Sequence, residues 1–301
     1  MDVSAYRKRT TEEVAAAAEL APTKEAQSRS ADPRSLAGAN ASQTARLETV
    51  RAMSLQVRND PANIDGLIAV LADRSQPAAV RIAALDGLQS ATFLVQTFAP
   101  KRPQYLETLR SIIEDPDRSL RRRALGVLAR EKDEYVQRRL IEGLEHPSKA
   151  LVSAAKAIQY LGYDVHAEYF PLLRRIVEHP PTAIAQQEAI RVLAADPKSQ
   201  ALLTRILTDK KQPSSARYMS AISLQSLAPA RFQGIARKIA LDDGEDDQLR
   251  VASLTALAHY AAPQTTPPQG AFTRQIEKLQ EGSSSSELKR ATKAYIDRAR
   301  R

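Results

Sequence analysis

A nine-residue motif recurs along the chain, and this recurrence constrains the fold more than any other feature of the sequence. The clearest copies are VRIAALDGL at residues 80–88, LRRRALGVL at 120–128 and LRVASLTAL at 249–257. Weaker copies begin at residues 150, 185, 216 and 288, so the motif returns about every 35 residues. A period of this length is typical of a solenoid built from repeated units rather than of two unrelated globular domains.

Each copy of the motif follows a second apolar segment, such as NIDGLIAVLAD or QYLETLRSIIED. Both segments carry apolar residues at i, i+3, i+4 and i+7, which is the period of an α-helix and not of a strand. A polar turn, which in most copies contains proline, separates the two segments, and proline fits the first turn of a helix. The sequence therefore predicts an all-α fold, a right-handed α-solenoid of about seven helix pairs over residues 62–300.

The repeated motif resembles the HEAT repeat, in which a β-branched residue or leucine is followed by arginine and then by alanine and leucine. It looks most like the short bacterial type that is also found in phycobilisome lyases. The resemblance covers residues 62–300 and is loosest in the third and fourth units, where Leu151 and Gln186 replace the arginine. It implies a HEAT-like solenoid, an architecture that carries many unrelated functions.

The residues before the repeats differ from them in composition. Residues 1–42 are rich in Ala, Ser, Thr, Gln and charged residues, and we expect this segment to be disordered because it has few bulky apolar side chains to bury. Residues 44–58 carry apolar residues at helical spacing and predict a capping helix, so that the solenoid occupies residues 43–301. No apolar stretch resembles an export signal or a membrane span, and we expect a cytoplasmic protein without membrane insertion.

The sequence lacks the residue patterns of most catalytic and cofactor sites. It has no cysteine, and its ten glycines are too widely spaced for a phosphate-binding loop. The four histidines are not spaced as zinc ligands, and the acidic run at residues 242–247 lacks the ligand spacing of an EF-hand. We therefore predict that the protein is not an enzyme and holds no catalytic residue, metal or cofactor.

Arginine recurs directly after the first residue of the motif. It occupies positions 81, 121, 217 and 250, with Lys289 in the last copy. This position lies close to the apolar stripe of the helix, so the charge is partly buried and needs a partner. We expect Arg81, Arg121, Arg217 and Arg250 to form a structural ladder that joins neighbouring units through turn acids such as Asp73, Asp115 and Asp242, with ligand binding as the alternative.

The freer positions of the second helix lie two and six residues after the first residue of the motif. They place Arg122, Lys156 and Arg191 in three successive units, with Arg118 one turn before Arg122 and Tyr218 in the next unit. In HEAT solenoids the second helix lines the concave side, so the resemblance implies that these residues share a groove. Such a groove suits an acidic or amphipathic protein partner; the alternative is a solvated basic face with no ligand.

Three functional classes agree with these patterns. The first is a non-catalytic scaffold or adaptor that binds a partner protein or peptide in the groove. The second is a nucleic-acid-binding protein, which the net charge of +9 allows, although the sequence has no tryptophan and its 44 basic residues are diluted by 35 acidic ones. The third is an accessory protein or chaperone of the bilin-lyase type, which is suggested only by the resemblance of the repeats to those of phycobilisome lyases.

Overall fold

The fold is a succession of stacked helix pairs, seen in a computed structural model that describes residues 42–165, 168–260 and 270–300. Those residues contain helices, turns and loops and no strand. One helix, α2 (Gln43–Gln56), precedes the pairs, and Ser42 caps it by accepting a hydrogen bond from the amide of Ala45. The predicted all-α solenoid of about seven helix pairs is confirmed.

The first helices of the pairs are α3 (Ala62–Ala72), α6 (Arg102–Ser111), α8 (Glu134–Glu145), α10 (Phe170–Glu178), α12 (Gln200–Thr208), α14 (Pro229–Leu241) and α16 (Gly270–Gly282). The second helices are α4 (Ala78–Ala91), α7 (Arg118–Arg130), α9 (Ala154–Leu161), α11 (Ala183–Val192), α13 (Ser214–Leu227), α15 (Asp247–Tyr260) and α17 (Ser286–Ala299). Short helical segments are α5 (Val95–Phe98), η2 (Ala99–Lys101), η3 (Pro147–Lys149), η4 (Leu193–Ala195) and η5 (Pro197–Ser199).

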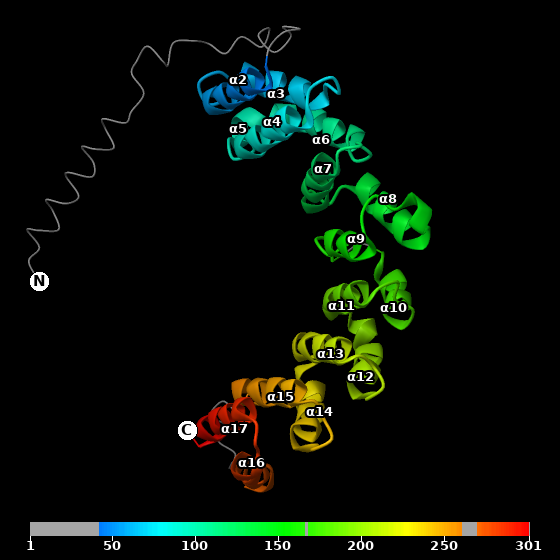
Figure 1. Ribbon diagram of the computed structural model, residues 1–301, viewed down its shortest axis with the longest axis vertical. Coiled ribbons are helices and arrows are strands. Elements are labelled where there is room, and N and C mark those ends of the chain that lie inside the picture. The colour runs from blue at the N-terminus through cyan, green and yellow to red at the C-terminus, as the bar shows by residue number, and fades with distance from the viewer. Residues whose placement is uncertain (1–41, 166–167, 261–269, 301) are drawn as a thin grey trace, which may run out of the picture. The chain divides into compact units, whose positions relative to one another are not determined.

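The chain divides into two compact units, residues 1–121 and residues 122–301, and the division falls within α7. In the first unit, α2 packs against both α3 and α4, and α6 packs against α3. In the second unit the second helices form one row, in which α11 contacts α9 and α13, and α15 contacts α13 and α17. The first helices α8, α10, α12, α14 and α16 follow one another along the other side of this unit (Figure 1).

The core of each pair comes from the apolar positions of the repeated motif. In α4 the side chains of Val80, Ala84, Leu85 and Leu88 are fully buried. These residues are spaced at i, i+4, i+5 and i+8, so they lie on one side of the helix, which faces its neighbours. The equivalent positions of α7 are filled by Leu120, Ala124, Leu125 and Leu128, all fully buried. The same small and large side chains thus recur at the same places in successive repeats.

The third helix pair, α8 and α9, departs from the predicted pattern at the start of its second helix. The motif copy at residues 150–158 predicts a helix that includes Leu151 and Val152, but α9 begins at Ala154. Ser153 has extended backbone angles and accepts a hydrogen bond from the Lys156 amide, so it is the N-cap. From Ala157 onward the buried positions agree with the motif again. Here a local capping preference overrides the periodic signal.

Two sequence-based expectations concern the ends of the chain and the membrane. The segment expected to be disordered, residues 1–42, lies outside the described residues except for Ser42. No helix among the described residues is both long enough and apolar enough to span a bilayer.

Candidate protein-binding surface

Arginine side chains at the repeated motif position are inserted between the helices of a pair. Arg81, Arg217 and Arg250 are buried, and in each the Nε atom donates to the backbone carbonyl ten residues earlier, at the end of the preceding first helix. The Nε–O distances are 2.9 Å for Arg81, 2.9 Å for Arg217 and 3.4 Å for Arg250. These bonds satisfy carbonyls that a helix end leaves without an intrahelical partner.

Two of these arginines also bind a carboxylate from the turn that joins the two helices of the next pair. Arg81 Nη1 lies 2.6 Å from Asp115 Oδ2, and both side chains are buried. Arg217 Nη1 lies 2.6 Å from Glu245 Oε1, and Nη2 donates to Oε2, which makes the pair bidentate. The hydrogen bonds from Arg217 are the main reason why the pKa of Glu245 lies below its ordinary value.

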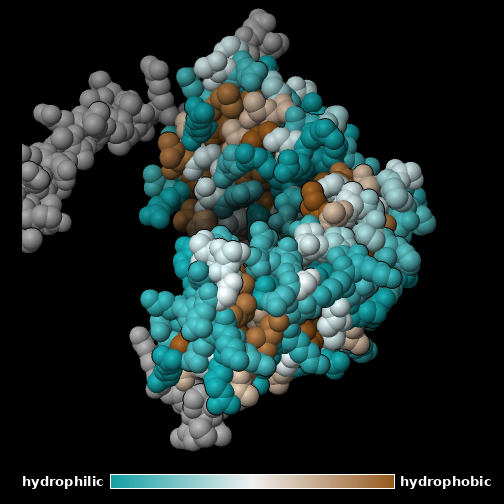
Figure 2. Space-filling view, turned by 60° about the horizontal axis from the view of Figure 1, so that its bottom comes forward, coloured by the Kyte–Doolittle hydropathy of each residue, from teal (hydrophilic) through white to brown (hydrophobic). Residues whose placement is uncertain are grey.

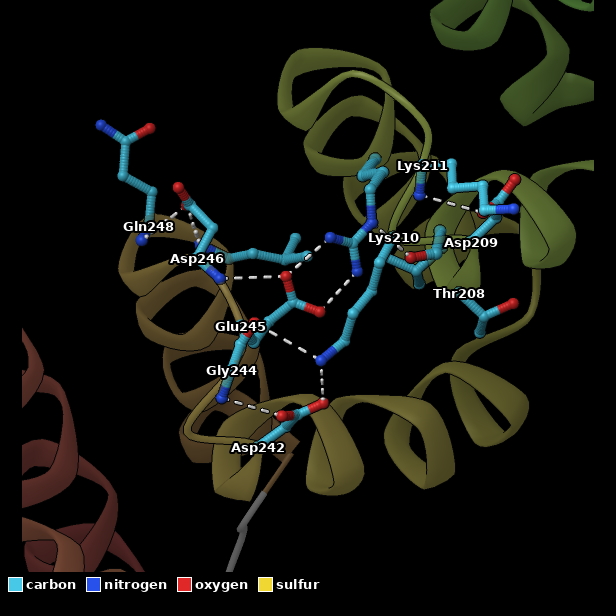
Figure 3. A network of polar contacts seen from close by, with 12 residues as sticks. Thr208, Asp209, Lys210, Lys211, Asp242, Gly244, Glu245, Asp246 and Gln248 are labelled. Carbon is cyan, nitrogen blue, oxygen red and sulfur yellow. Dashed lines mark hydrogen bonds and ion pairs between the residues drawn. The ribbon is translucent and has the colours of Figure 1, made fainter.

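The acidic run at residues 242–247 forms the turn that supplies Glu245. Asp242 accepts from the Gly244 amide at 3.0 Å and pairs with Lys210 Nζ at 2.7 Å (Figure 3). The hydrogen bond from Lys210 is the first cause of the lowered pKa of Asp242. This turn therefore uses its carboxylates to join two repeats, and the described residues contain no group of His, Asp and Glu that could hold a metal ion.

The predicted ladder is not uniform along the chain. Arg121 is only half-buried, and its Nη1 donates to the carbonyl of Asp115, not to a carboxylate, at 2.8 Å. Arg250 pairs with Asp243 of its own turn at 2.9 Å. The expected partner Asp73 instead accepts hydrogen bonds from Ser75, which are the main cause of its lowered pKa. The partner of each arginine thus depends on which turn acid the stacking brings within reach.

Two of the basic residues predicted to bind a partner lie around Tyr160, which is buried between α7 and α9. Tyr160 donates its hydroxyl hydrogen to the Arg122 carbonyl at 2.9 Å. Lys156 Nζ lies 4.7 Å from the centre of the Tyr160 ring and 2.7 Å from Gln159 Oε1. Burial raises the pKa of Tyr160, so the phenol stays protonated as a hydrogen-bond donor. Lys156 is thereby held in one place, and the Arg122 side chain is exposed.

The other predicted binding residues lie on neighbouring helices. Arg118 is the first residue of α7 and is exposed, one turn before Arg122. Arg191, on α11, is exposed and pairs with Glu188 on the same helix at 2.8 Å. Tyr218, on α13, is exposed. The structure thus brings Arg122 and Lys156 together on α7 and α9, and places Arg191 and Tyr218 on the next two helices of the row.

Sequence reasoning missed three residues on the same side of these helices. Arg130 and Tyr160 lie ten residues after the first residue of their motif copies, and Ile184 lies one residue before its copy. With 100° per residue, these positions fall within about 80° of the positions two and six residues after the start. Their helical angle is the signal in the sequence that places these three residues on the same side as Arg122 and Lys156.

Five positions on one side of the second helices hold no acidic residue from α7 to α15. We define this acid-free face by the helical positions one before and two, six, nine and ten after the first motif residue, starting at Arg122. None of these positions is Asp or Glu. The face includes Arg122, Arg130, Lys156, Gln159, Tyr160, Ile184, Gln187, Arg191, Tyr218, Ile222, Val251 and Thr255. These positions therefore hold basic, polar and apolar side chains only.

Comparisons with known proteins identify the repeats. Residues 106–194 match the family model for HEAT repeats. No curated protein matches the chain. Among solved structures, human deoxyhypusine hydroxylase in complex with glycerol is similar, with 13% sequence identity over 82% of this chain and 99% of that chain and a TM-score of 0.35. Residues 106–194 of this chain are thus HEAT repeats, and the repeated motif and the stacked helix pairs continue on either side of them.

Proposed function

We propose that the protein is a non-catalytic scaffold that binds an acidic segment of a partner protein on the acid-free face. The observation that carries this proposal is the basic cluster of α7 and α9, formed by Arg122, Arg130 and Lys156. No carboxylate among the described residues forms an ion pair with these three side chains. Unpaired cations on one side of a row of helices attract an anionic ligand and set its orientation.

A contrast within the second unit supports this assignment. Two basic residues on its first helices are paired across repeats: Arg175 pairs with Glu145 at 3.1 Å, and Arg205 pairs with Glu178. Their charge is therefore used to join repeats. Lys156 is also held by Tyr160 and Gln159, so less side-chain freedom is lost when a ligand binds.

The proposal is tested by reversing the charges of Arg122, Arg130 and Lys156 to Glu together in the full chain. Wild-type and triple-variant proteins are immobilised, and nuclease-treated extract is passed over both before quantitative mass spectrometry. We expect a protein partner that the wild type retains and the variant loses by at least about tenfold, because rim charges speed association. The melting temperature stays nearly unchanged, since exposed charges contribute little to stability.

The matched control is Arg231→Glu, an exposed arginine near the start of α14 on the other side of the unit. It changes the net charge in the same direction and is expected to leave binding unchanged. A partner that binds the triple variant as well as the wild type would contradict the proposal. Binding that disappears on nuclease treatment would assign the face to nucleic acid instead.

A further inference from the structure

Exposed apolar side chains occupy the part of the acid-free face that follows the basic cluster. Ile184 on α11 is 66% exposed, and Tyr218 and Ile222 on α13 are 41% and 43% exposed. Tyr218 and Ile222 are four residues apart and lie on the same side of their helix. Because α11 packs directly against α13, these three side chains belong to neighbouring helices of one row.

Nine large apolar side chains are exposed on the described surface, and Ile184, Tyr218 and Ile222 are the three of them that lie on second helices. Figure 2 shows one side of the molecule, on which hydrophobic residues gather in small groups between wide hydrophilic areas. A set of three on adjacent helices, with no acidic residue among the face positions around it, therefore marks a surface suited to a partner. Single exposed apolar side chains such as Leu55 in the first unit carry no such meaning.

The chemistry of the face changes along the row of second helices. The unpaired cations lie on α7 and α9, and the apolar side chains lie on α11 and α13. Between them, Arg191 is neutralised by Glu188. The positive charge thus ends where the apolar surface begins, and a ligand that covers all four helices meets two environments in sequence.

From these observations we infer that the partner segment is polarised, with an acidic half on α7 and α9 and an apolar half on α11 and α13. This inference rests on the proposed function and specifies its ligand. Packed helices lie about 10 Å apart, so four of them cover about 30 Å. A helix of about 20 residues has that length, at 1.5 Å per residue. The occupant is therefore an amphipathic protein segment whose acidic and apolar residues are separated along its length.

The test measures binding of three labelled synthetic peptides to the full chain by fluorescence anisotropy. All have about 20 residues, the length of the four-helix span. The block peptide has Glu in one half and Leu in the other; the mixed peptide has the same residues interspersed; the acidic peptide has Gln in place of Leu. We expect the block peptide to bind at least about tenfold more tightly than either of the others.

Variants assign that difference to the apolar part of the face. The double substitution Ile184→Ser and Ile222→Ser is expected to remove the advantage of the block peptide and to leave binding of the acidic peptide unchanged. Leu55→Ser, which alters a still more exposed apolar residue in the first unit, is the control and is expected to change neither. All three peptides are expected to lose affinity in the variant with Arg122, Arg130 and Lys156 reversed to Glu.

The outcomes separate this inference from the proposed function. Equal affinity for the block and acidic peptides, or for the block and mixed peptides, would overturn the polarised ligand while leaving the acidic-partner proposal intact. Binding that the charge-reversed variant does not weaken would overturn both. A labelled oligonucleotide that binds where no peptide does, or self-association that Ile222→Ser abolishes, would replace the protein segment by nucleic acid or by a second copy of the chain.

Discussion

At the scale of single residues, the Arg217–Glu245 pair shows how one repeat is fastened to the next. The two side chains are 6% and 3% exposed, so neither charge has access to water. Such a pair adds little relative to well-packed apolar side chains, but loss of one partner leaves a buried charge without compensation. Loss of either charge is therefore expected to cost more stability than the intact pair contributes.

Replacement of Glu245 by Gln is expected to lower the free energy of unfolding by about 3 kcal/mol at neutral pH, because Arg217 loses its counter-charge. The folded-state pKa of Glu245 lies below the ordinary value of 4.5. The stabilisation by this carboxylate is therefore complete above that pH and is lost as the pH falls through the folded-state pKa. Urea unfolding of the wild type and of the Glu245→Gln variant measures this. The difference between their free energies of unfolding should become smaller as the pH is lowered.

Asp243→Asn is the control for this experiment. Asp243 pairs with Arg250, but its side chain is 91% exposed, so we expect a loss below about 1 kcal/mol. If both substitutions destabilised the protein equally, burial would not be what distinguishes these ion pairs.

The sequence predicted the burial of these arginines better than it predicted their partners. Arg81 and Arg217 lie next to the apolar stripe of their helices, and helical geometry alone places them near the core. Their carboxylates come from a turn about 30 residues later, as with Asp115 for Arg81 and Glu245 for Arg217. Which carboxylate pairs with each arginine depends on how far each turn projects and on how the helix pairs stack. The spacing of apolar residues in the sequence predicts neither of these.

At the scale of elements, α9 is the shortest of the second helices and has a glycine at its C-terminal end. A Cβ atom added at Gly162 would lie 2.8 Å from Cγ2 of Val192, a buried and conformationally stiff side chain. At Gly126, within α7, an added Cβ would meet Tyr160 at 3.6 Å, which is an ordinary contact. Substitution by alanine at the two glycines therefore compares a position without room for a methyl group with a position that has room for one.

Gly162→Ala is expected to destabilise the protein by about 1–3 kcal/mol, since the new methyl group overpacks the α9–α11 contact. Gly126→Ala is expected to stabilise it by about 0.5–1 kcal/mol, because alanine restricts the unfolded chain and fits the helix. Chemical denaturation of both variants measures the two effects. A stabilising Gly162→Ala would mean that Val192 moves aside freely.

Periodicity predicted the existence of the second helices well and their starting residues less well. In α9 the spacing of apolar residues extends back to Ala150, yet the helix begins at Ala154. The Ser153 side chain bonds to the Lys156 amide, and that local bond decides the boundary. As a result Lys156, expected in mid-helix, lies in the first turn.

At the scale of the whole molecule, α2 closes the N-terminal end of the first unit. Its side chains of Val50 and Met53 are fully buried, and Val57, which follows the helix, is nearly so. A Cβ added at Gly87 would lie 2.1 Å from Ser54 Oγ, so α2 and α4 approach closely there. Terminal elements of this kind cover the apolar side of a solenoid.

Deletion of residues 1–58 is expected to lower the melting temperature by several degrees, because it exposes the apolar surface of α3 and α4 that α2 covers. Deletion of residues 1–41, which keeps the Ser42 cap, is expected to leave it nearly unchanged, since those residues include few bulky apolar side chains. Thermal unfolding of the three proteins, followed by circular dichroism, measures this. A large loss from the shorter deletion would show that residues 1–41 contribute to the fold.

The architecture could be predicted from the sequence because every repeat carries the same apolar pattern. Ile184, Arg130 and Tyr160 occupy positions that differ from repeat to repeat, so no recurrence marks them. The acid-free face is visible only when successive helices are aligned by helical angle, and that alignment depends on how the helices stack.

The ion pairs between repeats of the second unit differ in burial, so the junctions between repeats differ in their sensitivity to salt. Where α12–α13 meets α14–α15, the ion pair between Arg217 and Glu245 is buried, and dissolved salt has little access to it. Where α8 meets α10, the ion pair between Glu145 and Arg175 is exposed, and where α10 meets α12 the exposed pair Glu178–Arg205 lies beside the partly buried pair Arg174–Asp196. We therefore expect rising ionic strength to weaken the exposed pairs and to leave the Arg217–Glu245 pair intact, so that the junction between α8 and α10 loosens before the junction that holds Glu245.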